Sequence, residues 1–190
     1  MGTGKSTVAH KVQMVLGAKY YHERYADNPY IARLYEGDNS YTTVRDCQTT
    51  SISLTIRNLE NALLDPGSHE YAIVDVTPMY IYQVYCKGAF LDDLLTNEDM
   101  YHMGRLVKPF TKLIDFHFGL TATFDEILKR IKSRDRKMEA LICPDTVASR
   151  LKLSTAYLQP DNQYHESMTI IDTTEKDPMV VTGDILNAVL

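Results

Sequence analysis

Tryptophan is absent from the sequence, and cysteine is scarce. The three cysteines, Cys47, Cys86 and Cys143, lie far apart and form no C-x-x-C pair. An odd, scattered set gives no signal for a zinc site or a disulfide framework, and it suits a reducing cytosol. The sequence also has no signal peptide and no long apolar run, so we expect a cytoplasmic protein without a membrane span.

Positive charge is in deficit, with 20 lysines and arginines against 25 acidic residues and a formal net charge of −5. This balance argues against a broad nucleic-acid-binding surface, and we expect no nucleic-acid partner, although a local basic site is still compatible with it. No repeat, low-complexity tract or linker interrupts the 190 residues. Residues 1–190 are therefore predicted to form a single domain with its own hydrophobic core.

The first stretch of the chain carries the clearest chemistry: Met1-Gly2-Thr3-Gly4-Lys5-Ser6-Thr7. It matches the second half of the phosphate-binding pattern G-x-x-x-x-G-K-[ST]. Glycines let successive backbone N–H groups turn toward phosphate oxygens, and the helix that follows adds its N-terminal dipole. We expect this stretch to bind the phosphates of ATP, with Lys5 reaching the β- and γ-phosphates and Ser6 ligating Mg²⁺.

One part of this pattern is missing from the sequence. The first glycine of the pattern, and the strand that comes before it, would lie ahead of Met1. Either the start of the chain is truncated or mis-assigned, or the loop is incomplete. The genomic sequence just upstream of Met1 would distinguish these alternatives.

Strand-like and helix-like segments alternate along the rest of the chain. The predicted strands are residues 19–23, 71–75, 115–120 and 168–172. The predicted helices are residues 6–16, 27–35, 42–64, two within 79–112, one from 123 into the basic run near 132, 144–158 and 178–190. Alternation of this kind after a phosphate loop predicts an α/β fold with three α/β/α layers, a parallel sheet and a helical lid.

Two of the predicted strands end in a carboxylate, Glu23 and Asp75. Because ligands of parallel α/β sheets bind at the carboxyl ends of the strands, both carboxylates should lie beside the phosphate loop. Glu23 suits the base that takes a proton from an acceptor hydroxyl, or else it pairs with Arg24. Asp75 suits a Mg²⁺ ligand, or else it caps a helix that begins at Thr77-Pro78.

A basic run, Arg130 to Arg136, follows the helix that begins near Thr123. Closely spaced arginines at a helix end can close over phosphates as a lid and exclude water. The alternative is a solvated helix end, which favours cations.

Two further polar residues lie in apolar surroundings. His117 lies in a predicted apolar strand and is expected to be structural. Gln48 lies on the apolar stripe of the predicted helix 42–64 and needs a hydrogen-bond partner.

Four stretches together resemble the deoxynucleoside kinase family and span nearly the whole chain. They are the phosphate loop; Tyr21-His22-Glu23-Arg24 with Asn28-Pro29-Tyr30 and Leu34-Tyr35-Glu36; Ile127 to Arg136 with Glu139; and Thr169-Ile170-Ile171-Asp172. The resemblance implies that Glu23 is the base on the sugar 5′-hydroxyl and that Tyr35 and Glu139 lie near the 3′-hydroxyl. It also implies that Gln48 reads the nucleobase edge through its paired donor and acceptor.

On the donor side, the resemblance implies that Lys5 and Arg134 act with Glu23 in catalysis and that Arg130, Arg134 and Arg136 contact ATP. Family members are commonly dimers that pack through long helices. A homodimer is therefore expected by resemblance, with the helices around Leu54 and Leu106 as candidate surfaces.

The chain departs from the family at several places. The family's Asp-Arg-Ser or Glu-Arg-Ser is here Asp75-Val76-Thr77, so an arginine is missing, and Arg24 or Arg105 would have to substitute for it. Three hypotheses stay open. The chain is a nucleoside kinase, a phosphotransferase that acts on a nucleotide or a modified nucleobase, or a catalytically weakened nucleotide-binding subunit that regulates a partner.

Overall fold

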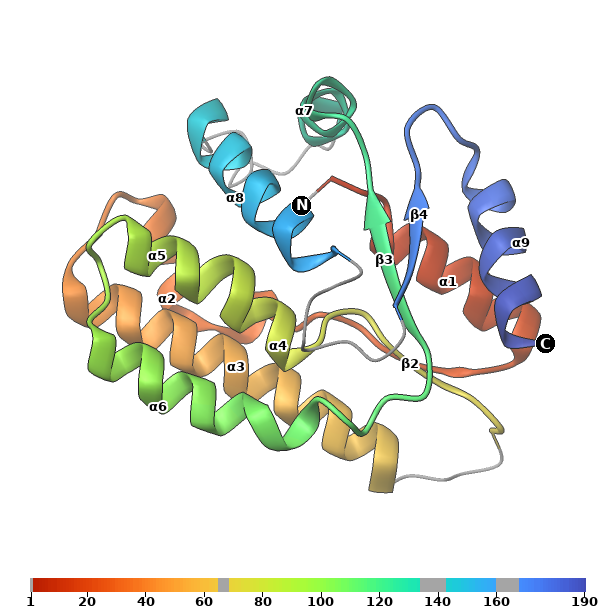
Figure 1. The fold of residues 1–190 in the computed structure, drawn as a ribbon, viewed down its shortest axis with the longest axis horizontal. Helices are drawn as coiled ribbons and strands as arrows, with labels where there is room; N and C mark the ends of the chain where they lie inside the picture. The colour runs from red at the N-terminus through yellow and green to blue at the C-terminus, as the bar shows by residue number, and fades with distance from the viewer. Residues whose placement is uncertain (1, 65–68, 134–142, 160–167) are drawn as a thin grey trace.

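Four parallel strands carry the fold, and helices cover them (Figure 1). The computed structural model describes residues 2–64, 69–133, 143–159 and 168–190. The strands are β1 (Lys19–Tyr21), β2 (Ala72–Val74), β3 (His117–Thr121) and β4 (Met168–Asp172). The larger helices are α1 (Lys5–Leu16), α2 (Pro29–Tyr35), α3 (Tyr41–Leu64), α6 (Asn97–Val107), α7 (Phe124–Ser133), α8 (Pro144–Tyr157) and α9 (Pro178–Val189).

Local sequence signals set the ends of several helices. Gly17 adopts a left-handed conformation (φ 61°) and ends α1. The Asn28 side chain accepts a hydrogen bond from the backbone N–H of Tyr30 and caps α2, with Pro29 in the first helical position. Thr96 and Asp99 form a reciprocal capping box at the start of α6. Each cap satisfies backbone groups that a helix end would otherwise leave unpaired.

The two helices predicted within residues 79–112 are both present. The first is continuous from Pro78 to Leu91, but its middle turn is π-helical: α4 (Pro78–Tyr80) leads into η2 (Ile81–Cys86) and then α5 (Lys87–Leu91). The second is α6, extended by the 3₁₀ turn η3 (Lys108–Phe110), and a further 3₁₀ turn, η1 (Tyr25–Asp27), precedes α2. Single π-helical turns are rare and often occur at functional sites.

The strand pairing is parallel, as predicted, but the described strands form two ladders. β1 pairs with β2, with Tyr21 opposite Val74, and β3 pairs with β4, with Thr121 opposite Asp172. Within the described residues these remain a pair of two-stranded sheets. β1 and β2 are shorter than predicted, so Glu23 lies beyond its strand and Asp75 directly follows β2.

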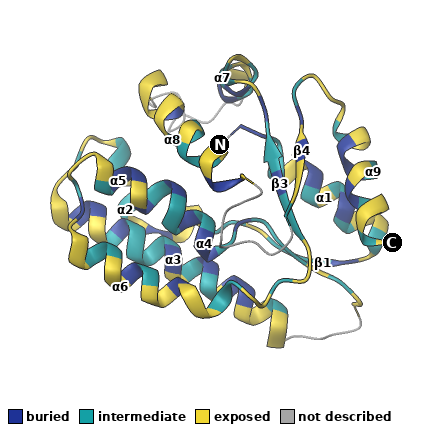
Figure 2. Ribbon diagram, viewed as in Figure 1, coloured by how far each residue is buried: buried dark blue, intermediate teal, exposed yellow. Residues whose placement is uncertain are grey.

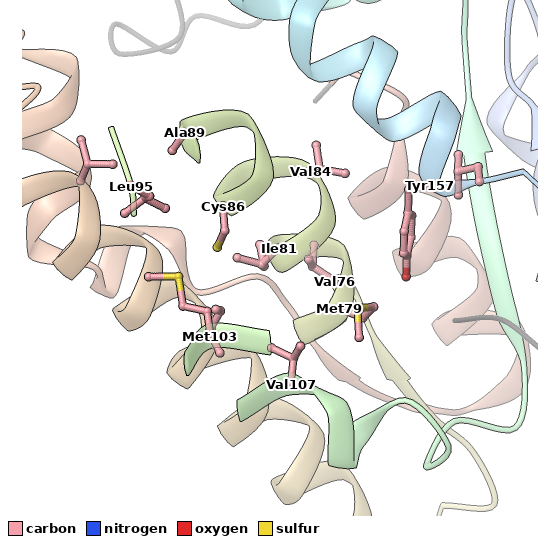
Figure 3. Close-up of a cluster of buried hydrophobic side chains, with 13 residues drawn as sticks. Val76, Met79, Ile81, Val84, Cys86, Ala89, Leu95, Met103, Val107 and Tyr157 are labelled. Carbon is pink, nitrogen blue, oxygen red and sulfur yellow. The ribbon is translucent and has the colours of Figure 1, made fainter. Parts of the chain in front are cut away.

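Three hydrophobic clusters hold the helices against the strands (Figure 2). The largest lies among α3, the α4–η2–α5 helix, α6 and α8, and Figure 3 shows Met103 and Val107 of α6 beside the turns that carry Met79 and Ile81. The second joins α1 and α9 to β4 and includes Val12. The third packs α7 on α8.

These layers correspond to the predicted α/β/α architecture. They also bring the amino end of α1 and the carboxyl ends of the strands to one side of the domain, because the start of the chain bonds to the residue that follows β4. Within the described ranges, every helix is too short or too polar to cross a bilayer.

Candidate active site

The glycines of the first stretch take the conformations that a phosphate loop requires. Gly2 and Gly4 have φ values of 69° and 85°, in the left-handed region that side chains disfavour, and α1 begins immediately afterwards at Lys5. A Cβ on Gly2 would lie 2.9 Å from the Cγ2 atom of Ile127. Ser6 and Thr7 are exposed in the first turn of α1, where backbone N–H groups favour an anion.

Arg130 ties this loop to the ends of β3 and β4. Its guanidinium donates to the Thr173 side-chain oxygen (2.9 Å), to the Thr173 carbonyl (2.6 Å), to the Gly2 carbonyl (3.4 Å) and to Glu126 (2.7 Å). The buried Thr173 hydroxyl also lies 3.1 Å from the carbonyl oxygen of Thr3. Arg130 therefore lies at the phosphate loop and holds its start in place. Sequence reasoning missed Thr173, whose only signal is its position after the last strand.

Ser6 and Asp75 meet across the site. The Ser6 hydroxyl donates to Oδ2 of Asp75 at 2.9 Å, while Oδ1 is buried and has no hydrogen-bond partner within the described ranges. The Thr77 side chain, not Asp75, caps the next helix, so the alternative role for this carboxylate is wrong. Burial and then the charge of Asp75 raise the pKa of the neighbouring Tyr20, which stays a neutral hydroxyl at physiological pH.

A hydroxyl and a carboxylate oxygen are the ligands that Mg²⁺ prefers, and the unpartnered Oδ1 of Asp75 fits a cation at this place. In the part of the chain that the structure describes, no group of three His, Cys, Asp or Glu side chains could hold a metal alone. Mg²⁺ sites that are completed by substrate phosphates commonly use only one or two protein ligands. The residues present therefore fit this cation.

Glu23 lies at the same edge as Asp75, because Tyr21 and Val74 are paired and the Asp75 N–H donates to the Tyr21 carbonyl. The Asn58 side chain donates to the His22 carbonyl at 2.8 Å and fixes the chain just before Glu23. Arg24 bonds to Asp27 (2.6 Å). No ion pair joins Glu23 to Arg24 in the described structure, so the predicted alternative for Glu23 is not supported.

The electrostatic environment of Tyr85 includes Glu23 and two further tyrosines. Loss of water around the Tyr85 hydroxyl, and then the charges of Tyr80, Glu23 and Tyr35, raise the pKa of Tyr85. Glu23 and Tyr35, at the end of α2, therefore both lie within electrostatic reach of Tyr85. Tyr85 comes from the π-helical turn η2, and sequence reasoning missed it because helical periodicity gives no signal for such a turn.

Gln48 finds its partner on the same turn. The Cys86 thiol donates to the Gln48 side-chain oxygen across 3.8 Å, so the amide of α3 faces η2 beside Tyr85. The start of α2 is fixed to this part of α3, since the Asn28 amide donates to the Cys47 carbonyl and to the Ser51 hydroxyl, both at 2.8 Å. These bonds hold the amino end of α2 next to the turn of α3 that carries Gln48.

The arginine that acts on Tyr85 differs from those predicted. Arg24 pairs with Asp27, and the Arg105 guanidinium lies 5.9 Å from the ring centroid of Tyr101 on the exposed side of α6. Arg150 of α8 donates to Asp92 at 3.0 Å, while its Nη1 atom is buried without a partner within the described residues. Its positive charge acts on Tyr85 and on Cys86. Arg150 was not identified from the sequence.

Three predicted site residues lie outside the described residues: Arg134, Arg136 and Glu139. Their roles, and with them the predicted lid, remain predictions. The helix that leads into this segment, α7, is present and carries Arg130.

The sequence is similar to known nucleoside kinases. A family model described as deoxynucleoside kinase matches residues 1–185. The chain is 24% identical over 189 residues to a deoxyguanosine kinase of Lactobacillus acidophilus, covering 97% of this chain and 82% of that protein. It is also 24% identical over 176 residues to a deoxyguanosine kinase of Lactobacillus johnsonii, covering 90% and 78% of the two chains.

Solved structures share the fold. A deoxyadenosine kinase from M. mycoides with bound dCTP aligns at a TM-score of 0.81 and 22% identity, covering 100% of this chain and 94% of that one. A thymidylate kinase from Candida albicans aligns at a TM-score of 0.64 and 19% identity, covering 99% and 86%. The expected fold class is therefore confirmed.

Proposed function

The chain belongs to the deoxynucleoside kinase family, and from that premise we propose that it transfers the γ-phosphoryl group of ATP to the 5′-hydroxyl of a deoxynucleoside. The observation that carries this proposal is the contact between Ser6 of the phosphate loop and Asp75, at the sheet edge where Glu23 also lies. A donor site and an acceptor site then share one edge.

On the donor side, the backbone N–H groups of the Gly2–Thr7 stretch and the Lys5 ammonium would bind the β- and γ-phosphates. Ser6 and Asp75 would hold Mg²⁺, which neutralises charge on the transferring phosphates when it is bound. Arg130, Arg134 and Arg136 would complete the cationic surface around ATP. Support for this half comes from the left-handed Gly2 and Gly4 and from the bonds of Arg130 to the loop.

On the acceptor side, Glu23 would take the proton of the 5′-hydroxyl as that oxygen attacks the γ-phosphorus, and ADP would leave. Tyr35 and Glu139 would bind the 3′-hydroxyl. Gln48 would orient the base, because its amide offers one donor and one acceptor side by side. The nearness of Tyr35 and Glu23 to Tyr85 supports this half.

The test is ATP turnover with a panel of deoxynucleosides, with deoxyguanosine and deoxyadenosine first because relatives carry those names. Glu23→Gln keeps the shape of the side chain and removes the base, so we expect a loss of about 10²–10⁴-fold in kcat with nucleotide binding unchanged. Asp27→Asn, which changes a carboxylate bonded to Arg24, is the matched control and should keep its rate. A Glu23→Gln enzyme that retains its rate would show that Glu23 is not the base.

A second candidate function follows from the stretch Asp75-Val76-Thr77, where the family's arginine is absent. We propose as the alternative a nucleotide-binding subunit with weakened catalysis that regulates or stabilises a partner. The same panel separates the two: ATP binding without turnover on any nucleoside, nucleotide or nucleobase acceptor would favour this second function.

We also propose that the protein is a cytoplasmic homodimer that packs through its long helices. Support comes from exposed apolar side chains on α6, where Tyr101 is 61% exposed and Leu106 is 47% exposed. Light scattering of the protein and of a Leu106→Asp variant would test this proposal. A monomer at micromolar concentration, or a dimer that the substitution leaves unchanged, would argue against this surface.

A further inference from the structure

The hydroxyl of Tyr20 is a buried group that the proposed reaction does not use. Its oxygen has no hydrogen-bond partner within the described residues, and the same is true of Oδ1 of Asp75. Unpartnered groups of this kind are uncommon in folded proteins, because each of them costs free energy when it is buried. A donor and an acceptor that both lack a partner therefore point to a shared role if they lie close together.

The register of the first ladder places Tyr20 and Asp75 on one face of the strands. Tyr20 is paired with Ile73, and the ladder continues to Asp75, whose N–H donates to the Tyr21 carbonyl. Side chains two residues apart on a strand point to the same side, so Asp75 shares the side of Ile73 and Tyr20. Two residues along and one strand across correspond to about 8 Å between Cα atoms, which a tyrosine side chain can span.

Helix α1 covers this face and contacts both side chains. The Ser6 hydroxyl donates to Oδ2 of Asp75 at 2.9 Å. One helical turn later, the His10 ring packs on the Tyr20 ring with 5.1 Å between the ring centroids. Residues four apart lie on one side of a helix, so these two contacts agree with the register of the strands. The Tyr20 ring therefore lies under α1, beside the carboxylate that Ser6 contacts.

The hydroxyl and the carboxylate are complementary as hydrogen-bonding groups. Burial, and then the negative charge of Asp75, raise the pKa of Tyr20, so its hydroxyl keeps its proton and can donate. An ionised carboxylate can only accept. Because Oδ2 already accepts from Ser6, Oδ1 is the oxygen of Asp75 that still lacks a donor.

We propose that Tyr20 is a positioning residue for Asp75: its hydroxyl donates to Oδ1, through one bridging water where a direct bond is too long, and fixes the carboxylate beside Ser6. Held through both oxygens, the carboxylate keeps its remaining lone pairs directed at the cation. Tyr20 itself contacts neither the nucleotide nor the cation. The cation site, Ser6 with Asp75, is that of the proposed function, on which the role of Tyr20 rests.

Such a contact acts on the cost of binding the cation. A carboxylate that is oriented in advance loses less rotational freedom when it binds Mg²⁺ than one that can turn. Removing a group that orients a metal ligand typically weakens metal affinity by about 10–100-fold. A hydroxyl with a purely structural role would instead affect the stability of the protein and leave the cation affinity unchanged.

The experiment uses Tyr20→Phe, which removes only the hydroxyl and keeps the ring against His10. Tyr21→Phe is the matched control, because the Tyr21 hydroxyl donates to the Asn61 carbonyl at 3.1 Å and lies on the other face of the same strand. The probe is the non-hydrolysable β,γ-imido analogue of ATP. Its affinity is measured by calorimetry in EDTA and at a series of Mg²⁺ concentrations, so the Mg²⁺ dependence reports the cation site without turnover.

We expect Tyr20→Phe to bind the analogue in EDTA as the parent does, and to need about tenfold more Mg²⁺, or above, for the same gain in affinity. Tyr21→Phe should follow the parent curve. Without nucleotide, the Tm of Tyr20→Phe should lie within about 2 °C of the parent value. In an Asp75→Asn background, Tyr20→Phe should cause no further change in the Mg²⁺ dependence, because the hydroxyl acts only through the carboxylate.

An unchanged Mg²⁺ dependence in Tyr20→Phe would overturn the role of Tyr20 alone, provided that the parent responds to Mg²⁺. Weaker binding in EDTA would also overturn it, since the hydroxyl would then act on the phosphate loop. An equal change in Tyr21→Phe, or an additive change in the Asp75→Asn background, would contradict an effect through Asp75. A parent whose affinity for the analogue does not respond to Mg²⁺ would contradict the proposed cation site, and the role of Tyr20 with it.

Discussion

Replacing Arg130 with alanine provides the sharpest test of how the phosphate loop is held. The side chain is 21% exposed and donates to Gly2, Thr173 and Glu126. The resemblance to known kinases assigns Arg130 to ATP, whereas its contacts make it a brace between the loop and the ends of β3 and β4. If Arg130 braces the loop, its loss should lower the stability of the protein without nucleotide. If Arg130 only binds ATP, that stability should not change.

The magnitude follows from the contacts. A hydrogen bond to a charged group contributes about 1.5–3 kcal/mol when it is buried, and an exposed ion pair contributes about 0–1 kcal/mol. The two short bonds to Thr173 dominate, while the 3.4 Å contact to Gly2 and the partly exposed pair with Glu126 add little. Partial access of water reduces the sum, so we expect Arg130→Ala to destabilise the protein by about 2–4 kcal/mol. For a chain of this size, that corresponds to a fall in Tm of about 6–12 °C.

The assay is thermal unfolding of the protein without nucleotide, followed by titration with ATP. Arg105→Ala is the matched control, since the Arg105 guanidinium contacts only the exposed Tyr101 ring among the described residues, and its Tm should change by less than about 2 °C. Arg130→Lys keeps the charge but loses the planar fork, so it should recover less than half of the loss. An Arg130→Ala protein that melts like the parent and only binds ATP more weakly would refute the bracing role.

Two further predictions concern Gly88 and the thiols. Alanine in place of a helical glycine normally stabilises a protein by about 0.5–1 kcal/mol. A Cβ on Gly88 would lie 1.4 Å from Nη1 of Arg150, so Gly88→Ala should lower Tm. A Cβ on Gly183 would meet no atom within 4 Å, so Gly183→Ala should raise Tm. A rise in both variants would show that Arg150 moves aside at no cost. Burial raises the pKa of the Cys47 thiol to about 11, so this thiol stays protonated at pH 8 and should react with an alkylating reagent far more slowly than the exposed Cys143. Mass spectrometry of peptides after limited labelling would check the order, and equal labelling of the two thiols would contradict it.

Much of the fold could be predicted because its signals are local. Gly17 ends α1, and the Asn28-Pro29 pair begins α2, because capping and backbone geometry depend on a few neighbouring residues. Periodicity was less reliable at the end of a long helix. The apolar spacing of α3 continues to Leu63, but this side chain, in the last turn of the helix, is 48% exposed.

The candidate site divides in the same way. Glu23 and Asp75 could be identified from strand ends, because parallel strands bring their carboxyl ends to one edge. The partner of Gln48 could not be predicted, because Cys86 is distant in sequence and faces α3 only through a π-helical turn that no periodic pattern signals. Arg150 lies on α8 and reaches its neighbours through the gap left by Gly88, a relation that exists only after helices pack.

By itself, the sequence determined the chemistry available: a phosphate loop, two strand-end carboxylates and a parallel α/β order, all carried by residues close together in the chain or by simple alternation. The tertiary structure decided between the alternatives that the sequence left open. Thr77 caps its helix, so Asp75 is free to bond to Ser6. Arg24 bonds to Asp27, so it forms no ion pair with Glu23 in the described structure. The reason is physical: hydrogen-bond partners and sheet neighbours are chosen by distance in space, which sequence spacing does not encode.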